Sequence, residues 1–144
     1  MLALVMTILS STSSLADVVK DCIVPAVVQV ESSGNHNAVG PDGDSFGLMQ
    51  LQLATAQDFG YRGNEIGLLN PIKNIHYGTL YVRYLLKRYQ GKVYVALDAY
   101  NRGMLNVENH PYRGDWELHR YVGKIIQHLR IICPDWESQY VEQR

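Results

Sequence analysis

The sequence predicts a mainly α fold in a single domain. Apolar residues recur at three-to-four-residue spacing in several segments, no segment alternates convincingly as a strand would, and glycine- and proline-rich stretches separate the segments. The 144 residues are 47% hydrophobic and 19% charged, which suits one globular domain with a sizeable core. There is no internal repeat and no low-complexity linker, so we expect residues 17–144 to form one domain.

Residues 1–16 have the pattern of a secretory signal peptide. A short apolar run leads into small polar residues that end in Ser14-Leu15-Ala16, a sequence that suits an export peptidase. The first lysine is Lys20, so a basic segment before the apolar run is missing, and a buried N-terminal helix is the alternative. No apolar run reaches the roughly 20 residues that span a bilayer. We therefore expect an exported protein, in the periplasm or cell envelope, with no integral membrane span.

The first helix predicted after this segment ends in an acid. Pro25 suits the first turn of a helix with Val27 and Val30 on its apolar face, and short polar residues with Gly34 stop it directly after Glu31. The partial negative charge of a helix C-terminus and desolvation by flanking apolar segments both favour the protonated carboxyl group, and so raise its pKa. Glu31 is therefore a candidate acid in a partly desolvated cleft.

The rest of the chain alternates predicted helices with loops. The longest helix opens at Asn70-Pro71, since asparagine caps helices and proline suits their first turn. Clusters of glycine, proline, asparagine and aspartate predict the loops. The predicted helices cover residues 53–59, 71–90, 93–102 and 116–132, and the predicted irregular segments are residues 36–45, 61–69, 104–114 and a polar tail at 136–144.

The charge balance excludes two classes of partner. The formal net charge is −1 and the isoelectric point about 6.5, which gives no basic surface for nucleic acid or for an anionic membrane. Ten of the aromatic residues are tyrosines, whose rings and hydroxyl groups suit stacking on sugars. We expect no nucleic acid partner and recognition by shape and hydrogen bonds.

The two cysteines, Cys22 and Cys133, lie near the two ends of the predicted domain and lack metal-ligand spacing. In an exported protein they would form one disulfide, which contributes about 4 to 5 kcal/mol for a loop of this length in the chain-entropy model. In a cytosolic protein they would be core thiols. The five histidines share no metal spacing either, so no metal site is predicted.

Four short motifs stand in order along the chain, with a fifth segment after them. They are Glu31-Ser32 with Asn35 and Ala38; Gly-Leu-Met-Gln-Leu at 47–51 with Thr55-Ala56; Asn74-Ile75 with Gly78 and Tyr81; Ala96-Leu97 with Ala99-Tyr100-Asn101 and Gly103; and Tyr121-Val122 with Lys124. Together they resemble the soluble lytic transglycosylase (SLT) domain of the goose-lysozyme-like superfamily. The resemblance covers roughly residues 25–126.

This resemblance implies a lysozyme-like domain with a catalytic cleft and an enzyme that cleaves peptidoglycan glycan strands. Glu31 would protonate the β-1,4 bond between N-acetylmuramic acid and N-acetylglucosamine, and would then act as a base to give a 1,6-anhydro end. No metal and no organic cofactor is implied. The short length and exported character resemble the small transglycosylases that accompany secretion, conjugation or pilus machines, with a phage origin as an alternative.

The resemblance also implies which residues contact the glycan. Tyr100 and Asn101 match a pair whose tyrosine hydroxyl lies near the acid, and Gln50 would supply amide hydrogen bonds beside Met49 in the sugar cleft. The alternatives are core packing for Tyr100 and Met49 and a structural role for Gln50. The expected substrate-binding residues are Ser32, Ser45, Met49, Gln50, Tyr100 and Asn101.

Two other functions stay open at this point. Asp42 and Asp44 lie in residues 41–46, where the chain departs from the family pattern, and either could position water as in a hydrolytic lysozyme. Acids in such a loop are otherwise turn formers. A non-catalytic glycan-binding or assembly module would keep the fold without needing an acid, and the presence of Glu31 argues against it.

Overall fold

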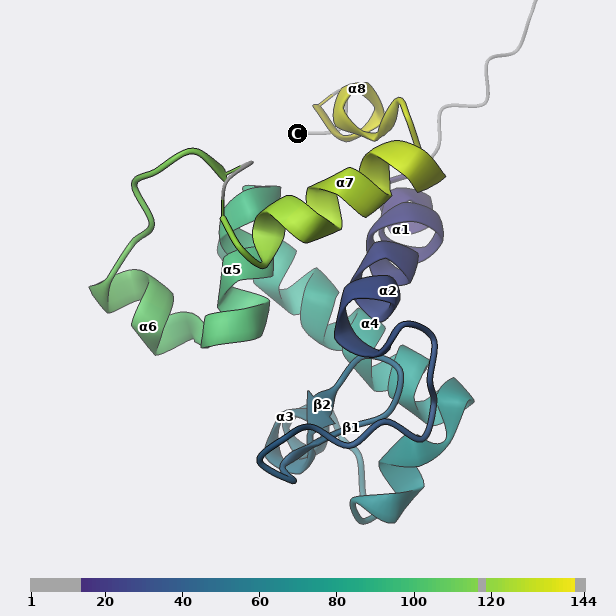
Figure 1. The fold of residues 1–144 in the computed structure, drawn as a ribbon. Coiled ribbons are helices and arrows are strands. Elements are labelled where there is room, and N and C mark those ends of the chain that lie inside the picture. The colour runs from purple at the N-terminus through teal and green to yellow at the C-terminus, as the bar shows by residue number, and fades with distance from the viewer. Residues whose placement is uncertain (1–13, 117–118, 142–144) are drawn as a thin grey trace, which may run out of the picture.

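The computed structural model describes residues 14–116 and 119–141, and it confirms the mainly helical fold (Figure 1). Most of the predicted signal segment lies outside these residues, and its last two positions begin the first helix. The α-helices within the described ranges are α1 Leu15–Val18, α2 Val24–Ser32, α3 Leu53–Asp58, α4 Pro71–Arg88, α5 Val93–Arg102, α6 Met104–Asn109, α7 Val122–Ile132 and α8 Trp136–Val141.

The N-terminal helical segment begins earlier than the sequence indicated. A π-helical turn, Val19–Ile23, joins α1 to α2, so the helical segment starts before Pro25, which the sequence had placed in its first turn. Val18 and Ile23 are buried, with Val19 and Cys22 beside them, and they give this segment an apolar face of its own. Burial of this face against the core explains why the helix extends N-terminal to the proline.

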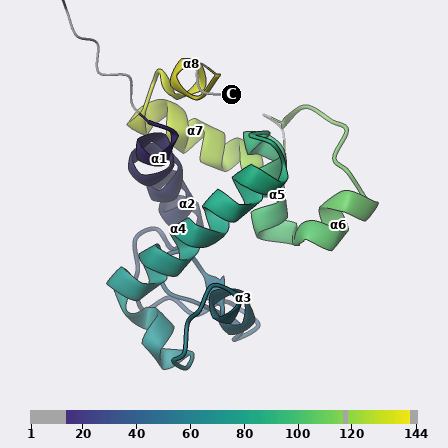
Figure 2. The ribbon, with the colours of Figure 1, turned by 180° about the vertical axis from the view of Figure 1, so that it is seen from behind.

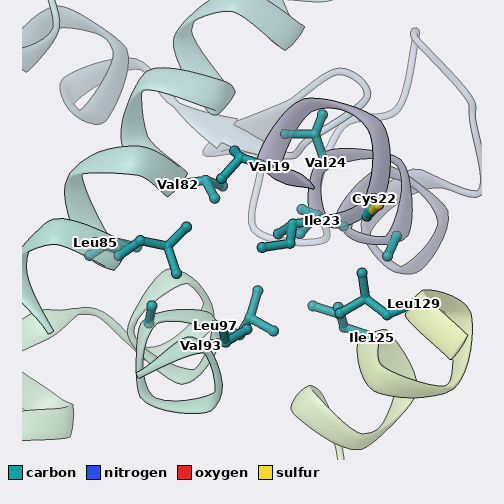
Figure 3. Close-up of a cluster of buried hydrophobic side chains, with 14 of the residues drawn as sticks. Val19, Cys22, Ile23, Val24, Val82, Leu85, Val93, Leu97, Ile125 and Leu129 are labelled. Carbon is teal, nitrogen blue, oxygen red and sulfur yellow. The ribbon is translucent and has the colours of Figure 1, made fainter. Parts of the chain in front are cut away.

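The main core lies where α4, α5 and α7 meet the N-terminal helical segment (Figure 3). α2 packs on α7, and α4 packs on α5, so helices far apart in the sequence enclose one apolar centre. Among the side chains that point into this centre are Val19, Ile23, Val82, Leu85, Val93, Leu97, Ile125 and Leu129.

The long helix α4 begins as predicted. The side chain of Asn70 accepts a hydrogen bond from Lys73 N at 3.1 Å, and Pro71 occupies the first turn. A 3₁₀ turn, Ile66–Leu69, precedes it, and α3 and the two short strands lie beside its N-terminal half (Figures 1 and 2). The strands β1, Ser45–Phe46, and β2, Leu51–Gln52, form an antiparallel hairpin.

The segment after α5 is helical where a loop was expected. Gly103, with φ of 82°, ends α5 as predicted, but α6 follows at once. Val107 is buried, and the Asn106 side chain donates a hydrogen bond to Arg102 O at 2.6 Å, which ties α6 to the end of α5. The loop prediction for residues 104–114 is therefore wrong for its first half.

Two boundaries near the C-terminus also differ from the expectation. Helix α7 begins at Val122 instead of near residue 116, and the tail expected to be irregular contains α8. Trp136 and Tyr140 lie four residues apart on α8 and are both 2% exposed. Two buried aromatic side chains thus hold a helix whose intervening residues, Glu137 to Gln139, are polar.

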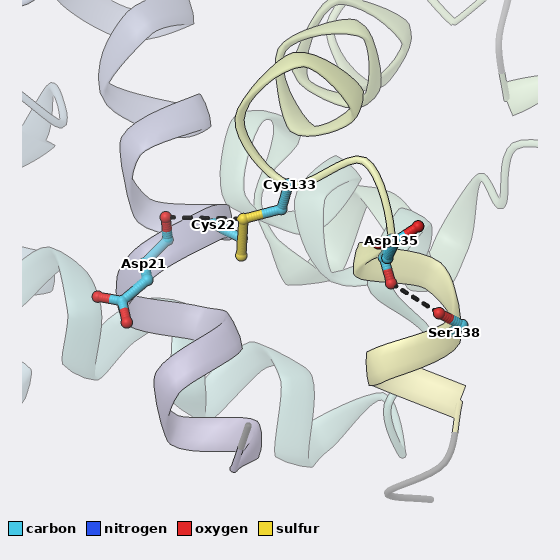
Figure 4. Close-up of a disulfide and its surroundings, with 5 residues drawn as sticks. All are labelled: Asp21, Cys22, Cys133, Asp135 and Ser138. Carbon is cyan, nitrogen blue, oxygen red and sulfur yellow. Dashed lines mark hydrogen bonds between the residues drawn. A yellow bond between two sulfur atoms is a disulfide. The ribbon is translucent and has the colours of Figure 1, made fainter. Parts of the chain in front are cut away.

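A disulfide joins the N-terminal helical segment to the end of α7 (Figure 4). The sulfur atoms of Cys22 and Cys133 are 2.09 Å apart, and the bond spans 111 positions of sequence. Cys133 Sγ also lies 3.9 Å from the carbonyl oxygen of Asp21. The bond therefore links the first and last helical parts of the core directly.

Candidate active site

A cleft of about 790 Å³ opens beside the C-terminal end of α2. The β-hairpin and the loop before it form one side, and the end of α5 with α6 forms another. Residues that line it include Glu31, Asp42, Asp44, Ser45, Gln50, Gln52, Thr55, Tyr81, Tyr100, Asn101, Arg102, Met104 and Leu105. Carboxyl, amide, hydroxyl and apolar groups thus meet in one space, as expected of a site for a polar ligand with apolar faces.

Glu31 is presented by the end of α2. The chain leaves the helix through two residues in the left-handed region, Ser33 with φ of 53° and Gly34 with φ of 80°. Glu31 itself is partly buried, and desolvation raises the pKa of its carboxyl group. The hydroxyl of Tyr121 donates a hydrogen bond to Glu31 Oε1 at 2.5 Å, which opposes the rise in pKa but does not cancel it.

Two tyrosines frame this carboxyl group. Tyr100 donates from its hydroxyl to the carbonyl oxygen of Met49 at 2.7 Å, and its ring packs at 5.2 Å from that of Tyr81. Burial, with a smaller contribution from the Glu31 carboxylate, raises the pKa of Tyr100 and of Tyr121 well above the ordinary value. Both phenols therefore stay protonated and act as hydrogen-bond donors at neutral pH.

Gln50 fixes the turn between the two strands. Its backbone is in the left-handed region, with φ of 47°, which is unusual for a residue other than glycine. Its amide nitrogen donates to Gly47 O at 2.9 Å and to Ala38 O at 3.2 Å, and its amide oxygen accepts from Ser45 Oγ at 3.1 Å. Both amide hydrogens are bonded to backbone carbonyl groups of the loop. The Gln50 side chain therefore holds the loop in the conformation that forms this part of the cleft wall.

Asn74 of α4 holds the same turn through side-chain hydrogen bonds. It is fully buried on α4, and its Oδ1 accepts from Met49 N at 2.7 Å. Its Nδ2 donates to Phe46 O at 2.7 Å and to Leu68 O at 2.8 Å. A Cβ atom on Gly47 would lie 2.5 Å from Asn74 Nδ2, so glycine is required for this close approach. One buried amide thus fixes the backbone that carries Gln50.

Replacing Asn74 with Ala should destabilise the protein by about 3 kcal/mol, because the buried groups that it pairs lose their partner. Replacing Asn70, the exposed cap of the same helix, with Ala should cost only about 1 kcal/mol. Urea unfolding of the two variants measures the difference. Equal losses would show that the Asn74 hydrogen bonds do not control the stability of the turn.

The structure brings some of the predicted site residues together and separates others. Ser45, Gln50, Tyr100 and Asn101 line the cleft with Glu31. Two predicted contacts lie elsewhere. Met49 is 0% exposed, and its sulfur lies under Gly78, where an added Cβ would be 2.3 Å away. Ser32 is absent from the cleft wall, and its hydroxyl donates to Leu48 O at 2.8 Å, so both Met49 and Ser32 hold the loop against α2 and α4.

Tyr121 lies beside Glu31, although the sequence predicted no role for this tyrosine. Tyr121 lies 90 positions after Glu31 in the sequence and immediately precedes α7. Its hydroxyl contacts the Glu31 carboxyl group. The only sequence signal was its place in the Tyr121-Val122 motif with Lys124. The acids Asp42 and Asp44 do line the cleft, and Asp44 accepts from Gln52 Nε2 at 3.1 Å.

Residues 14–116 and 119–141 contain neither a candidate metal site nor a helix that could cross a membrane. Three or more His, Cys, Asp or Glu side chains nowhere gather in a way that could hold a metal ion. None of the helices there combines the length and the apolar character needed to cross a membrane.

Comparison with known proteins places the fold. The model of the transglycosylase SLT domain matches residues 10–117. An inactive mutant of the lytic transglycosylase Slt from Pseudomonas aeruginosa superimposes with a TM-score of 0.65 at 23% identity, over 84% of this chain and 22% of that one. The 70 kDa soluble lytic transglycosylase from Escherichia coli gives 0.57 at 21% identity, over 83% and 21%. The chain thus spans about a fifth of their length and shares their lysozyme-like fold.

Proposed function

The chain belongs to the transglycosylase SLT domain family, and on that premise we propose that it is a peptidoglycan lytic transglycosylase with Glu31 as its catalytic acid and base. The observation that carries the proposal is the partly buried Glu31 carboxyl group, which has a raised pKa and faces a cleft of about 790 Å³. Such a group is protonated more readily than an exposed glutamate, as an acid catalyst requires.

In the first step, Glu31 donates its proton to the oxygen that links N-acetylmuramic acid to N-acetylglucosamine. The bond from the anomeric carbon to that oxygen breaks, and N-acetylglucosamine leaves with a new hydroxyl group. The acetamido oxygen of the N-acetylmuramic acid bonds to the anomeric carbon and stabilises its positive charge. The hydrogen bond from Tyr121 stabilises the carboxylate that Glu31 becomes.

In the second step, the Glu31 carboxylate removes the proton from the C6 hydroxyl group of the same sugar. The C6 oxygen attacks the anomeric carbon, the acetamido oxygen leaves it, and a 1,6-anhydro ring closes. Glu31 is protonated again, and no water is consumed. The attack is intramolecular, so the enzyme needs to hold one sugar in a reactive geometry and does not need a bound nucleophile. Tyr100, Asn101, Ser45 and Gln50 line the space where that sugar would sit.

The experiment that tests this function is digestion of purified peptidoglycan sacculi, with the products identified by mass spectrometry. A lytic transglycosylase gives 1,6-anhydro ends, which are one water lighter than the reducing ends that a hydrolase gives. Reducing ends without anhydro sugar would refute the transglycosylase, and intact sacculi that retain the protein would point to a binding module.

Hydrolysis is the second candidate because Asp42 and Asp44 line the same cleft as Glu31. Either carboxylate could orient water toward the anomeric carbon. Replacing both with Asn separates the two mechanisms. The intramolecular reaction should keep its anhydro product in the double variant, whereas a hydrolase that depends on either carboxylate should lose its activity.

Replacing Tyr121 with Phe should slow cleavage by about 10- to 100-fold, the value of a hydrogen bond to a charged group. The hydrogen bond lowers the pKa of Glu31, so its loss raises that pKa further. An acid catalyst works while protonated, and kcat/KM falls as pH rises through its pKa. The alkaline limb of the kcat/KM profile should therefore move to higher pH in the variant. An unchanged limb would mean that Tyr121 does not contact Glu31 in the working enzyme.

We also propose that the protein is exported and acts in the periplasm or cell envelope, where its substrate lies, and that it serves a secretion, conjugation or pilus assembly. The signal-like residues 1–16 support export. Cleavage after Ala16 would remove the first two residues of α1 and leave the buried Val18 in the domain. N-terminal sequencing of protein recovered from the envelope, with Asp17 expected as the first residue, tests the export proposal.

A further inference from the structure

A second polar cluster lies behind the cleft wall and takes no part in the chemistry proposed above. Its centre is Asp98, which is 0% exposed in the middle of α5. Arg102, one turn later, donates from Nε to Asp98 Oδ1 at 2.6 Å and from Nη2 to the other carboxylate oxygen. Nη2 also reaches His110 O at 3.3 Å. A buried carboxylate is costly unless paired, and Arg102 neutralises this one while its own side chain lines the cleft.

The other partner of Asp98 is His119, which comes just before α7. His119 Nε2 lies 3.3 Å from Asp98 Oδ1, within hydrogen-bonding distance. His119 Nδ1 accepts from Val122 N at 3.2 Å, so the proton of a neutral ring is on Nε2, the nitrogen nearer the Asp98 carboxylate. Its carbonyl oxygen accepts from Gly123 N at 2.8 Å. The side chain thus caps the first turn of α7 and ties that turn to α5.

Tyr121 lies inside the turn that His119 caps. Its hydroxyl reaches Glu31 Oε1 from the start of α7, where His119 accepts the hydrogen bond of Val122 N. The rings of Tyr112 and Trp116 enclose the His119 ring, with centroids 4.6 and 5.6 Å away. An imidazole held by a carboxylate, a helix N-terminus and two aromatic rings has little freedom to move.

We infer that His119, anchored on Asp98, is a positioning residue that sets the Tyr121 hydroxyl against the catalytic carboxyl of Glu31. It does not line the cleft, and it acts on Glu31 through the first turn of α7. The inference rests on the proposed function, since the role of Tyr121 matters only if Glu31 is the acid. It gives a task to a histidine for which the sequence alone suggested none, and to a buried aspartate that the reaction does not use.

A double-mutant cycle tests the inference. His119→Ala should lower kcat about fivefold or more, with KM within about twofold, because a contact to a catalytic group is loosened while the sugar-binding wall stays in place. In the Tyr121→Phe background the same change should lower kcat by less than about twofold, since the hydroxyl that His119 positions is already gone. Equal effects of His119→Ala in the two backgrounds would overturn the inference.

Two further variants separate positioning from folding. His119→Asn keeps an acceptor for Val122 N but is too short to reach Asp98, so it should restore stability toward wild type while kcat stays low. If Asn restores kcat fully, the anchor on Asp98 is unnecessary and the inference fails in that part. His128→Ala, the same substitution at a histidine within α7 and outside the cleft wall, is the matched control and should leave kcat unchanged.

The pH profile gives an independent reading of the same contact. His119→Ala should move the alkaline limb of kcat/KM in the same direction as Tyr121→Phe, to higher pH, because the hydrogen bond on Glu31 is weakened. A variant with a lower unfolding midpoint and an unmoved limb would assign His119 a structural role only. Wild-type protein that releases no anhydro product would refute the proposed function instead, so the two failures are distinguishable.

Discussion

Replacing Glu31 with Gln should reduce the release of 1,6-anhydro products by about 10²- to 10⁴-fold, the range measured for loss of a general acid. Here one group serves both proton transfers, so the upper part of the range is expected. Glutamine has nearly the same shape and its amide oxygen can still accept from the Tyr121 hydroxyl. The rate of product formation on sacculi, followed by mass spectrometry, measures the effect.

The Glu31→Gln variant should lose activity without losing stability. Folding raises the pKa of Glu31 through burial, so the folded state binds the proton more tightly than the unfolded state. The carboxylate therefore costs stability once the pH exceeds the unfolded pKa, and Glu31→Gln removes that cost. The urea midpoint at neutral pH should be equal to or above that of wild type, with the difference shrinking as the pH falls.

A matched control for this prediction is Glu65→Gln. It makes the same chemical change at an exposed residue, at the turn that precedes α4 and outside the cleft wall. It should leave product formation unchanged. Wild-type rates in Glu31→Gln would remove this residue from the reaction, whatever its pKa. Lost activity together with a lower midpoint would instead indicate misfolding.

The parts of the fold that were predicted correctly depend on residues close together in the sequence. The start of α4 needed only Asn70-Pro71, because a cap and a first-turn proline act within one turn of helix. The C-terminal misses have a different cause. α8 forms because Trp136 and Tyr140 pack on distant parts of the chain, and His119, just before α7, contacts Asp98 of α5. Such contacts leave no mark in the local pattern.

The same distinction applies to the candidate site. The motif around Glu31 predicted the candidate acid, and the apolar segments beside it predicted the desolvation that raises its pKa. Which neighbours point into the cleft depends on the turn at residues 47–50, where Gln50 adopts a positive φ. That turn sends Met49 into the core and Gln50 to the cleft wall, although both belong to one motif. Spacing along the sequence could not distinguish the two.

Reduction of the Cys22–Cys133 disulfide should lower the free energy of unfolding by about 4 to 5 kcal/mol, the chain-entropy value for a loop of roughly 100 residues. The bond spans 111 positions, nearly the whole described domain. Its reduction therefore restores to the unfolded chain the conformational entropy that this long cross-link removes. Urea unfolding of oxidised and reduced wild-type protein measures the loss without introducing a cavity at the buried Cys22. Equal midpoints would show that the bond does not stabilise the fold.

The activity of the reduced protein separates a structural bond from one that shapes the site. Cys22 lies in the turn before α2 and Glu31 near the other end of that helix, about 13 Å further along its axis. α2 also packs on α7 through buried side chains that need no sulfur bond. Under conditions where reduced protein remains folded, its rate of cleavage should therefore equal that of the oxidised protein. A slower rate would mean that the bond also holds the C-terminal end of α2, with Glu31, in its position relative to Tyr121.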